Sequence, residues 1–235
     1  MFKFFSASNI FFIINKTIKF INSIFFLILV IGLTFALVLS PPDYLQGESV
    51  RIMYVHVPSA WLGVGCFSFI TLLSILNFIF KIKNFYFINK SIAPIGLLFT
   101  CLAIITGSLW GQPTWGTWWA WDARLTSMLV LMLFYVFYIL VFKIIKEEDL
   151  IIKISSIVAI IGSINLPIIK YSVEWWSTLH QPASIKITGS STIHSSMLLP
   201  LMVMLVVFLL YAALIFLMKY KTEIIKIKKK NLDRL

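Results

Sequence analysis

Charged residues are scarce in this sequence of 235 residues. Asp, Glu, Lys and Arg make up 12% of it, which is about half of what a soluble globular domain carries. Hydrophobic residues instead reach 60% and gather in long runs. A helix needs about 20 apolar residues to cross the hydrocarbon core of a bilayer. Six runs meet or approach that length: residues 21–39, 58–80, 92–110, 123–142, 151–169 and 196–218.

Two details of these runs affect the predicted topology. Asn165 and Pro167 interrupt the end of the fifth run, which is therefore the weakest span. The first run lacks a small-residue cleavage site, so we interpret it as a retained helix and not as a signal peptide. The pattern predicts an all-α integral membrane protein, a bundle of six transmembrane helices forming a single domain over residues 1–235.

Cysteine is nearly absent, and the motifs of several enzyme classes are missing. The two cysteines, Cys66 and Cys101, both fall inside apolar runs and form no C-x-x-C pair or C-x-x-C-H haem-attachment motif. This argues against a thiol–disulfide exchange centre and against covalently attached haem. The sequence also shows no glycine-rich phosphate loop, H-E-x-x-H motif or nucleophile–base pair. We expect no enzymatic activity.

Acidic residues are few: nine, against 20 basic residues. Only Arg51, Arg124, Lys170 and Lys186 lie on one side of the predicted helices, and the other basic residues lie on the opposite side. The positive-inside rule therefore places both termini in the cytoplasm or its equivalent. We interpret residues 219–235 as a basic cytoplasmic tail beside anionic membrane lipid, with no role in nucleic-acid binding.

Tryptophan gathers at the opposite, outer end of the predicted helices. The outer segments there are residues 40–57, 111–122 and 170–195. All eight tryptophans lie in these segments or at the adjoining helix ends: Trp61, Trp110, Trp115, Trp118, Trp119, Trp121, Trp175 and Trp176. An aromatic belt that anchors helices at the headgroup level decorates both interfaces. The one-sided distribution is therefore better explained by a binding surface.

Half of these tryptophans fall within WGTWWAWDARLT, residues 115–126. Positions i, i+3, i+4 and i+7 share one face of a helix, and here they hold Trp115, Trp118, Trp119 and Asp122. A short helix along the surface would offer a broad platform of indole planes to a large, flat, conjugated ligand. Asp122 directly precedes the fourth run, and we also expect it to cap that helix.

All three histidines also lie in the outer segments. His56 precedes the second predicted helix and His180 lies in EWWSTLHQ, so both belong to loops that adjoin tryptophans. Neutral imidazole is a usual axial ligand of haem iron, and we expect these two residues to be metal ligands. Arg124 is expected to bind a haem propionate through paired hydrogen bonds. We interpret His194 as a helix-start residue that binds no ligand.

These motifs resemble a known family. WGTWWAWDARLT looks like the tryptophan-rich WWD motif of haem-handling proteins in cytochrome c maturation. The stretches YVHVPSAW, APIGLLFT and LPIIKYSVEWWSTLHQPAS occur in matching order and narrow the resemblance to the C component of the System I pathway, CcmC. The resemblance covers about residues 40–185.

The resemblance implies a site and a set of partners. Proteins of this family hold haem b without a covalent bond at the outer, periplasmic-side face, with two loop histidines as axial ligands. In this sequence those positions are His56 and His180. The WWD segment, residues 111–126, would contact the porphyrin through Trp115, Trp118, Trp119, Trp121, Asp122 and Arg124. The family delivers haem to the chaperone CcmE, and the ATP-binding-cassette complex CcmA–CcmB and the small protein CcmD assist release of the loaded chaperone.

Two other classes remain open. The first is a b-type electron-transfer cytochrome, although such a protein ordinarily pairs histidines inside its helices and no histidine here falls within a predicted span. The second is a permease for another flat small molecule. The resemblance places the protein in a bacterial inner membrane, or in a mitochondrial inner membrane that retains the pathway.

Overall fold

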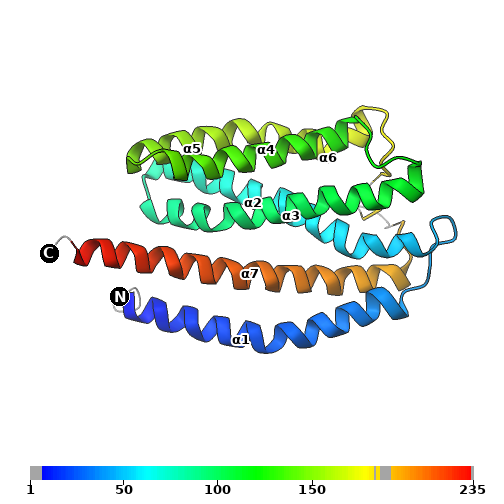
Figure 1. The fold of residues 1–235 in the computed structure, drawn as a ribbon, viewed down its shortest axis with the longest axis horizontal. Coiled ribbons are helices and arrows are strands. Elements are labelled where there is room, and N and C mark those ends of the chain that lie inside the picture. Colours follow the sequence, from blue (N-terminus) through cyan, green and yellow to red (C-terminus); the bar gives the residue numbers. More distant parts are fainter. Residues whose placement is uncertain (1–6, 183, 186–191, 234–235) are drawn as a thin grey trace.

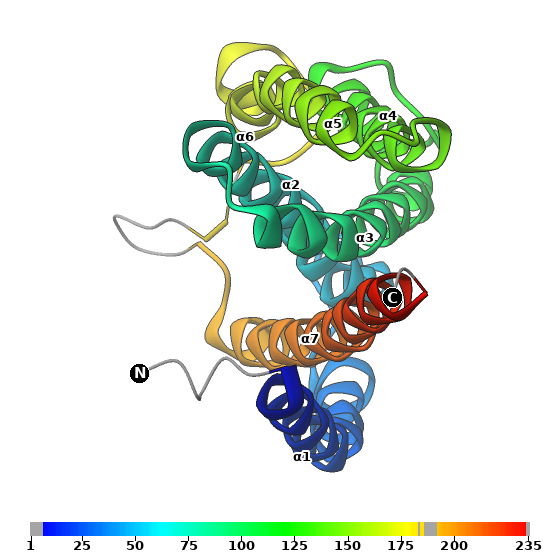
Figure 2. The same ribbon diagram turned by 90° about the vertical axis from the view of Figure 1, so that its left-hand side faces the viewer.

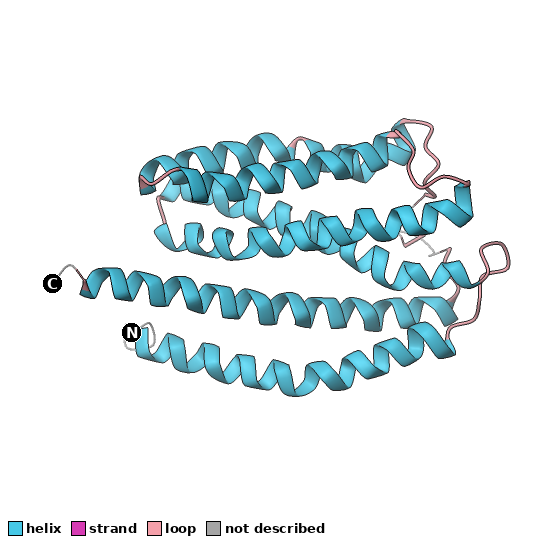
Figure 3. Ribbon diagram, viewed as in Figure 1, coloured by secondary structure: helices cyan, strands magenta, loops and turns pink. Residues whose placement is uncertain are grey.

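The structure is a computed structural model that describes residues 7–182, 184–185 and 192–233. Within them the regular elements are helical, and extended pairing is limited to one isolated bridge between Asp43 and Gly47 (Figure 3). The α-helices are α1 (Ala7–Thr34), α2 (Met53–Phe80), α3 (Lys83–Trp115), α4 (Ala123–Ile144), α5 (Glu148–Ser163), α6 (Asn165–Trp175) and α7 (Ser195–Leu232). A π-helical turn, η2 (Phe35–Leu39), extends α1, and a 3-10 helix, η3 (Glu48–Ile52), precedes α2. The predicted all-α fold is confirmed.

Six helical segments are long and apolar enough to cross a membrane: Phe11–Leu39, Glu48–Phe80, Asn84–Trp115, Ala123–Ile144, Glu148–Trp175 and Ser195–Lys229. They agree with the six predicted runs in number and order, but each is longer. The helices are longer because charged residues interrupt an apolar run but do not end a helix, since Lys and Arg are good helix formers. The basic tail predicted at residue 219 is accordingly helical as far as Leu232, as part of α7.

The fifth span is broken where the sequence indicated, yet it continues across the break. Ile164 alone separates α5 from α6. The side-chain amide of Asn165 donates a hydrogen bond of 2.8 Å to the Ser127 carbonyl of α4, which satisfies this buried polar group. Pro167 falls in the first turn of α6, where a missing N–H costs little.

The helices pack around two hydrophobic clusters. In the end-on view, α4, α5 and α6 lie together beside α2 and α3, with α7 and then α1 beyond them (Figure 2). The larger cluster includes Phe67, Leu131 and Tyr135, and the Tyr135 hydroxyl donates to the Gly63 carbonyl of α2 at 2.7 Å. The smaller cluster joins the start of α2 to α7 and the end of the first span. The first span has only 11% of its most apolar window buried, so most of α1 is left to face lipid.

The two ends of the bundle differ. The start of α1 and the end of α7 lie at one end, and the described parts of the segments that join α1 to α2, α3 to α4 and α6 to α7 lie at the other (Figure 1). We call the second end the loop end. An even number of spans requires this arrangement of the termini, and their cytoplasmic placement remains a prediction from the charge asymmetry. Three of the basic residues behind that prediction, Lys3, Lys186 and Arg234, lie outside the described residues.

Candidate functional site

A cavity of about 1020 Å³ lies at the loop end of the bundle. Its size is at the upper limit of ordinary small-molecule pockets, about 300–1,000 Å³. Residues of α2, α3, α4 and α6 and of all three connecting loops line it. Five of the predicted site residues are among them: His56, Trp115, Trp119, Arg124 and His180.

His56 lies in the first turn of α2, so its predicted position in a loop is wrong. The helix η3 leads directly into α2, and Pro58, the first residue of the predicted run 58–80, lies inside the helix. Burial of Val50 and Met53 in the smaller cluster stabilises these additional turns. One ligand candidate therefore lies on a spanning helix.

Neighbouring groups of α3 determine which nitrogen of His56 faces a ligand. The Nδ1 atom lies 3.0 Å from the Ala103 carbonyl oxygen and 3.2 Å from the Thr106 hydroxyl. Because a carbonyl only accepts hydrogen bonds, Nδ1 carries a proton, and in the neutral imidazole Nε2 then keeps a free lone pair. Gly107 provides the room, since a Cβ atom there would lie 2.9 Å from His56 Cε1.

His180 lies in the loop after α6 and has the same tautomer. Its Nδ1 lies 2.9 Å from the Gln181 carbonyl oxygen, which again leaves Nε2 unprotonated. The ring centres of His180 and His56 are 6.3 Å apart, with 34° between the planes. Removal from water, followed by the charge of Arg124, lowers the pKa of His180, so the imidazole is neutral at pH 7 and able to bind a metal.

Asp122 connects the tryptophan-rich segment to the loop that carries His180. Its Oδ1 atom accepts the Leu125 N–H at 2.8 Å, which confirms the predicted cap of α4. Its Oδ2 atom accepts the Leu179 N–H at 3.2 Å, one residue before His180. The second bond was not predicted, because it joins segments 57 residues apart in the chain.

The predicted surface helix over the WWD segment is wrong. α3 continues through Pro113 to Trp115 and ends at Gly116, whose φ of 74° is left-handed and suits glycine. Asp122 then takes extended backbone angles as the cap of α4, so residues 117–122 form no helix. The helical face that was expected to collect the tryptophans does not exist.

The four tryptophans consequently divide into two that line the cavity and two that are exposed outside it. Trp115 and Trp119 line the cavity, and the Trp115 ring centre lies 6.2 Å from that of His180. Trp118 and Trp121 are 59% and 78% exposed and are not part of the lining. Trp121 meets the edge of Trp119 at 5.5 Å between ring centres, so it supports the cavity wall from outside.

Trp110 was noticed in the sequence only as the end of a span, yet it belongs to the site. Its ring meets His56 edge to face, with 5.7 Å between ring centres. Its indole N–H donates to the Gln46 side-chain oxygen at 2.9 Å, which ties the first loop to α3. The one-sided clustering of tryptophans was the signal that could have identified it.

Two hydrogen-bond donors in the cavity wall have no acceptor among the residues that the structure describes. The Arg124 guanidinium forms no ion pair with any of them, and the buried indole N–H of Trp119 has no hydrogen-bond partner. Both groups suit a carboxylate of a ligand. His194 also lines the cavity, and it lies at the start of α7 as predicted, where its Nδ1 accepts the Ser196 N–H at 3.3 Å and caps the helix.

The donor set fits haem. A metal held between two imidazole nitrogens, at about 2.0–2.1 Å from each, requires ring centres roughly 6.3–6.5 Å apart, and the observed separation is 6.3 Å. Within the described part of the chain, no group of three His, Cys, Asp or Glu residues is placed to hold a bare metal ion. Two imidazoles alone suit an iron that brings its other ligands in a macrocycle. Arg124 and the Trp119 N–H would then meet its propionates.

Fold and cavity together define a polytopic membrane protein with paired imidazoles in an indole-lined site at one end of a six-span bundle. Comparison with known families specifies the class further. Residues 1–234 match the family described as "Heme exporter protein C", and the chain belongs to that family.

Individual relatives agree with this membership. "Heme exporter protein C" of Bradyrhizobium diazoefficiens is 38% identical over 207 residues, which cover 88% of this chain and 78% of the relative. The protein of the same name from Escherichia coli K12 is 39% identical over 204 residues, 87% and 82% of the two chains. A "Putative cytochrome c biosynthesis ccmC-like mitochondrial protein" of Marchantia polymorpha is 38% identical over 178 residues, 76% and 72% of the two chains.

Membership confirms the family predicted from the motifs. It also confirms that the chain is a membrane protein and not an enzyme. Relatives occur among both bacterial and mitochondrial proteins, the two alternatives raised by the sequence.

Proposed function

We propose that this protein binds haem b non-covalently at the loop end of its bundle and passes it on during maturation of c-type cytochromes. Its relatives are named as haem exporters and as cytochrome c biosynthesis proteins, which supports haem handling as the general role. One observation carries the proposal. The rings of His56 and His180 lie in one aromatic cavity with their centres 6.3 Å apart, and each has its Nδ1 atom hydrogen-bonded to a backbone carbonyl.

In this proposal His56 and His180 are the axial iron ligands, with Trp115 and Trp119 against the macrocycle. The two ligands are held unequally. His56 is fixed on α2 by hydrogen bonds to α3, whereas His180 lies on a loop that Asp122 holds through one backbone N–H. His180 is therefore the axial ligand that dissociates first when haem is released. Because the site is non-covalent, release requires no cleavage of a thioether bond.

We place this site on the outer, periplasmic side and propose the haem chaperone CcmE as acceptor, with CcmA–CcmB and CcmD assisting release of the loaded chaperone. The charge asymmetry supports the side. Trp118, Trp121 and Tyr44 are exposed at the loop end and offer apolar surface to an incoming partner. Topology reporters inserted after Leu45 and after Lys229 should report opposite sides, and the same side at both positions would refute the assignment.

The ligand assignment is tested with alanine variants of the three histidines. We expect His56→Ala and His180→Ala each to lose part of the bound haem and the low-spin absorption spectrum, because one coordination position opens. Added imidazole should restore a six-coordinate spectrum in each single variant. His194→Ala is the matched control and should change neither, since its ring caps α7. Wild-type haem content and spectrum in both ligand variants would refute the assignment.

One observation bears on the alternative of a b-type electron-transfer cytochrome. His56 lies within a spanning helix, contrary to the expectation from sequence. Its partner is a loop residue, however, and both lie at one end of the bundle, whereas electron transfer across a bilayer uses ligand pairs within the helices. Reduction of the bound haem by quinone would favour the cytochrome. Absence of a Soret band in the purified protein would instead favour a permease for another flat molecule.

A further inference from the structure

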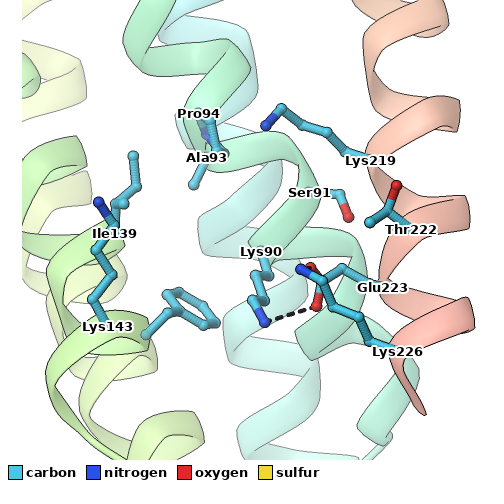
Figure 4. Close-up of a pocket in the computed structure, with 11 residues that line it drawn as sticks. Lys90, Ser91, Ala93, Pro94, Ile139, Lys143, Lys219, Thr222, Glu223 and Lys226 are labelled. Atoms are coloured by element: carbon cyan, nitrogen blue, oxygen red, sulfur yellow. Dashed lines mark hydrogen bonds and ion pairs between the residues drawn. The ribbon is translucent and has the colours of Figure 1, made fainter. Parts of the chain in front are cut away.

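A second cavity lies at the opposite end of the bundle from the paired imidazoles. Its volume is about 360 Å³, and its lining comes from α3, α4 and α7. Figure 4 shows Lys143 of α4 on one side, Lys219, Glu223 and Lys226 of α7 on the other, and Lys90 of α3 between them. Lysines that are far apart in the sequence, on α3, α4 and α7, thus line one cavity.

The charge of this cavity is unbalanced. Four lysines line it, together with a single carboxylate, that of Glu223. Glu223 accepts from Lys90 Nζ at 2.7 Å and from Lys226 Nζ at 2.8 Å, and its side chain is only 12% exposed. Lys143 and Lys219 have no ion pair with any residue that the structure describes. Two ammonium groups therefore remain available to an anion.

The remaining wall of the cavity is apolar. Ala93 and Pro94 of α3 and Ile139 and Phe142 of α4 complete the lining, and the Lys219 side chain reaches toward Ala93 and Pro94 (Figure 4). Lys143 is the penultimate residue of α4, so the cavity lies where a spanning helix leaves the hydrocarbon region. Lysines beside apolar side chains in one cavity fit a ligand with an anionic head and a hydrocarbon tail.

We propose that this cavity binds an anionic phospholipid. The phosphate accepts hydrogen bonds from Lys143 and Lys219, while Glu223 holds Lys90 and Lys226 in the same cavity, where their charges add to the attraction. An acyl chain lies along Ile139 and Phe142. Basic hollows between helices on the cytoplasmic side are a recurring place for lipid headgroups, and a free phosphate ion would make no use of the apolar wall.

The proposal is tested by native mass spectrometry of the full-length protein in detergent, titrated with phosphatidylglycerol. The double variant K143Q/K219Q should bind it about 25-fold more weakly, from about fivefold for each lysine. The matched control K228Q/K229Q removes the same charge from α7 outside the cavity lining and should change binding less than twofold. Both substituted lysines of the test variant are exposed, and unchanged thermal unfolding in phosphatidylcholine nanodiscs checks that the variant folds.

Two further binding measurements distinguish an anionic phospholipid from other ligands. Phosphatidylcholine should not bind measurably, and millimolar inorganic phosphate should not displace phosphatidylglycerol. The proposal is overturned if K143Q/K219Q binds phosphatidylglycerol as the wild type does, or if the control loses as much binding. Displacement by inorganic phosphate would identify the site as one for a soluble anion and would equally overturn the assignment to lipid.

Discussion

Gly107 leaves space for the His56 ring. Gly107→Ala should therefore weaken haem binding although neither proposed axial histidine is replaced. A Cβ atom at this position would lie 2.9 Å from His56 Cε1 and 3.4 Å from Nδ1. Ordinary carbon–carbon contact needs about 3.5–4.0 Å, so the imidazole must move by roughly 0.6 Å or more. That movement strains the hydrogen bond of 3.0 Å to the Ala103 carbonyl, which orients the ring.

The expected magnitude follows from the role of that hydrogen bond. Loss of a group that orients a metal-binding histidine typically costs 10- to 100-fold in metal affinity, so the Kd for haem should rise by about that factor. Titration of the purified apoprotein with haem, followed by Soret absorbance, measures the change. The low-spin spectrum should weaken, and added imidazole should restore it.

Ser68→Ala is the control substitution on α2, because Ser68 is exposed and lies outside the lining of the cavity. Thermal unfolding of both variants separates loss of the site from loss of the fold. If Gly107→Ala binds haem with wild-type affinity and an unaltered spectrum, then the position of the His56 ring does not determine coordination, and its role as a ligand is refuted.

Three further predictions concern the same cavity. Replacing Trp115 and Trp119 together with alanine should weaken haem binding about 5- to 150-fold, from about 0.5–1.5 kcal/mol for each aromatic contact. Replacing the exposed pair Trp118 and Trp121 should cost less than threefold in the same titration, and equal losses would contradict the division of the tryptophans. Asp122→Ala should destabilise the protein by about 1 kcal/mol through the lost cap, and it should also reduce haem content by releasing the His180 loop. Asp122→Asn keeps an oxygen acceptor and should retain most of the stability. Full haem content in Asp122→Ala would show that the hydrogen bond from the Leu179 N–H is dispensable. Because the charge of Arg124 lowers the pKa of His180, Arg124→Gln should raise that pKa. Protons compete with iron for Nε2, so acidification should remove the low-spin spectrum of Arg124→Gln at a higher pH than that of the wild type. Arg124→Lys keeps the charge and should lose its spectrum at the wild-type pH midpoint. An unchanged pH midpoint in Arg124→Gln would refute the effect of the Arg124 charge on His180.

The order and number of spans could be predicted from sequence, since each depends on local composition. A run of apolar residues near 20 long has few alternatives to a membrane helix, and the six runs correspond to the six spans observed. The cap provided by Asp122 was predictable for the same reason, because a cap bonds to an N–H two or three residues away. Helix ends were predicted less well, as at His56, where burial of Val50 and Met53 against distant helices adds turns.

The tryptophan-rich segment shows why periodicity was insufficient. The spacing from Trp115 to Asp122 fits a helix, but Gly116 ends α3 with a left-handed backbone conformation and Asp122 starts α4 from an extended one. Two boundary residues only six positions apart leave too little chain for a helix between them. The division of the indoles into a pair in the wall and a pair exposed therefore follows from the chain path and not from the pattern.

Three properties could be read from the residues alone: that this is a membrane bundle, which end carries the tryptophans, and which residue types are able to hold haem. Those properties depend on composition and on the order of segments along the chain. The packing of the helices sets the distance of 6.3 Å between the ring centres of His56 and His180. It also brings His56 to the Ala103 carbonyl and the Leu179 N–H to Asp122, while the Gln181 carbonyl favours the same tautomer in His180. Most of these contacts join residues that are dozens of positions apart, and their distances depend on how α2, α3 and α4 pack, which local pattern does not specify.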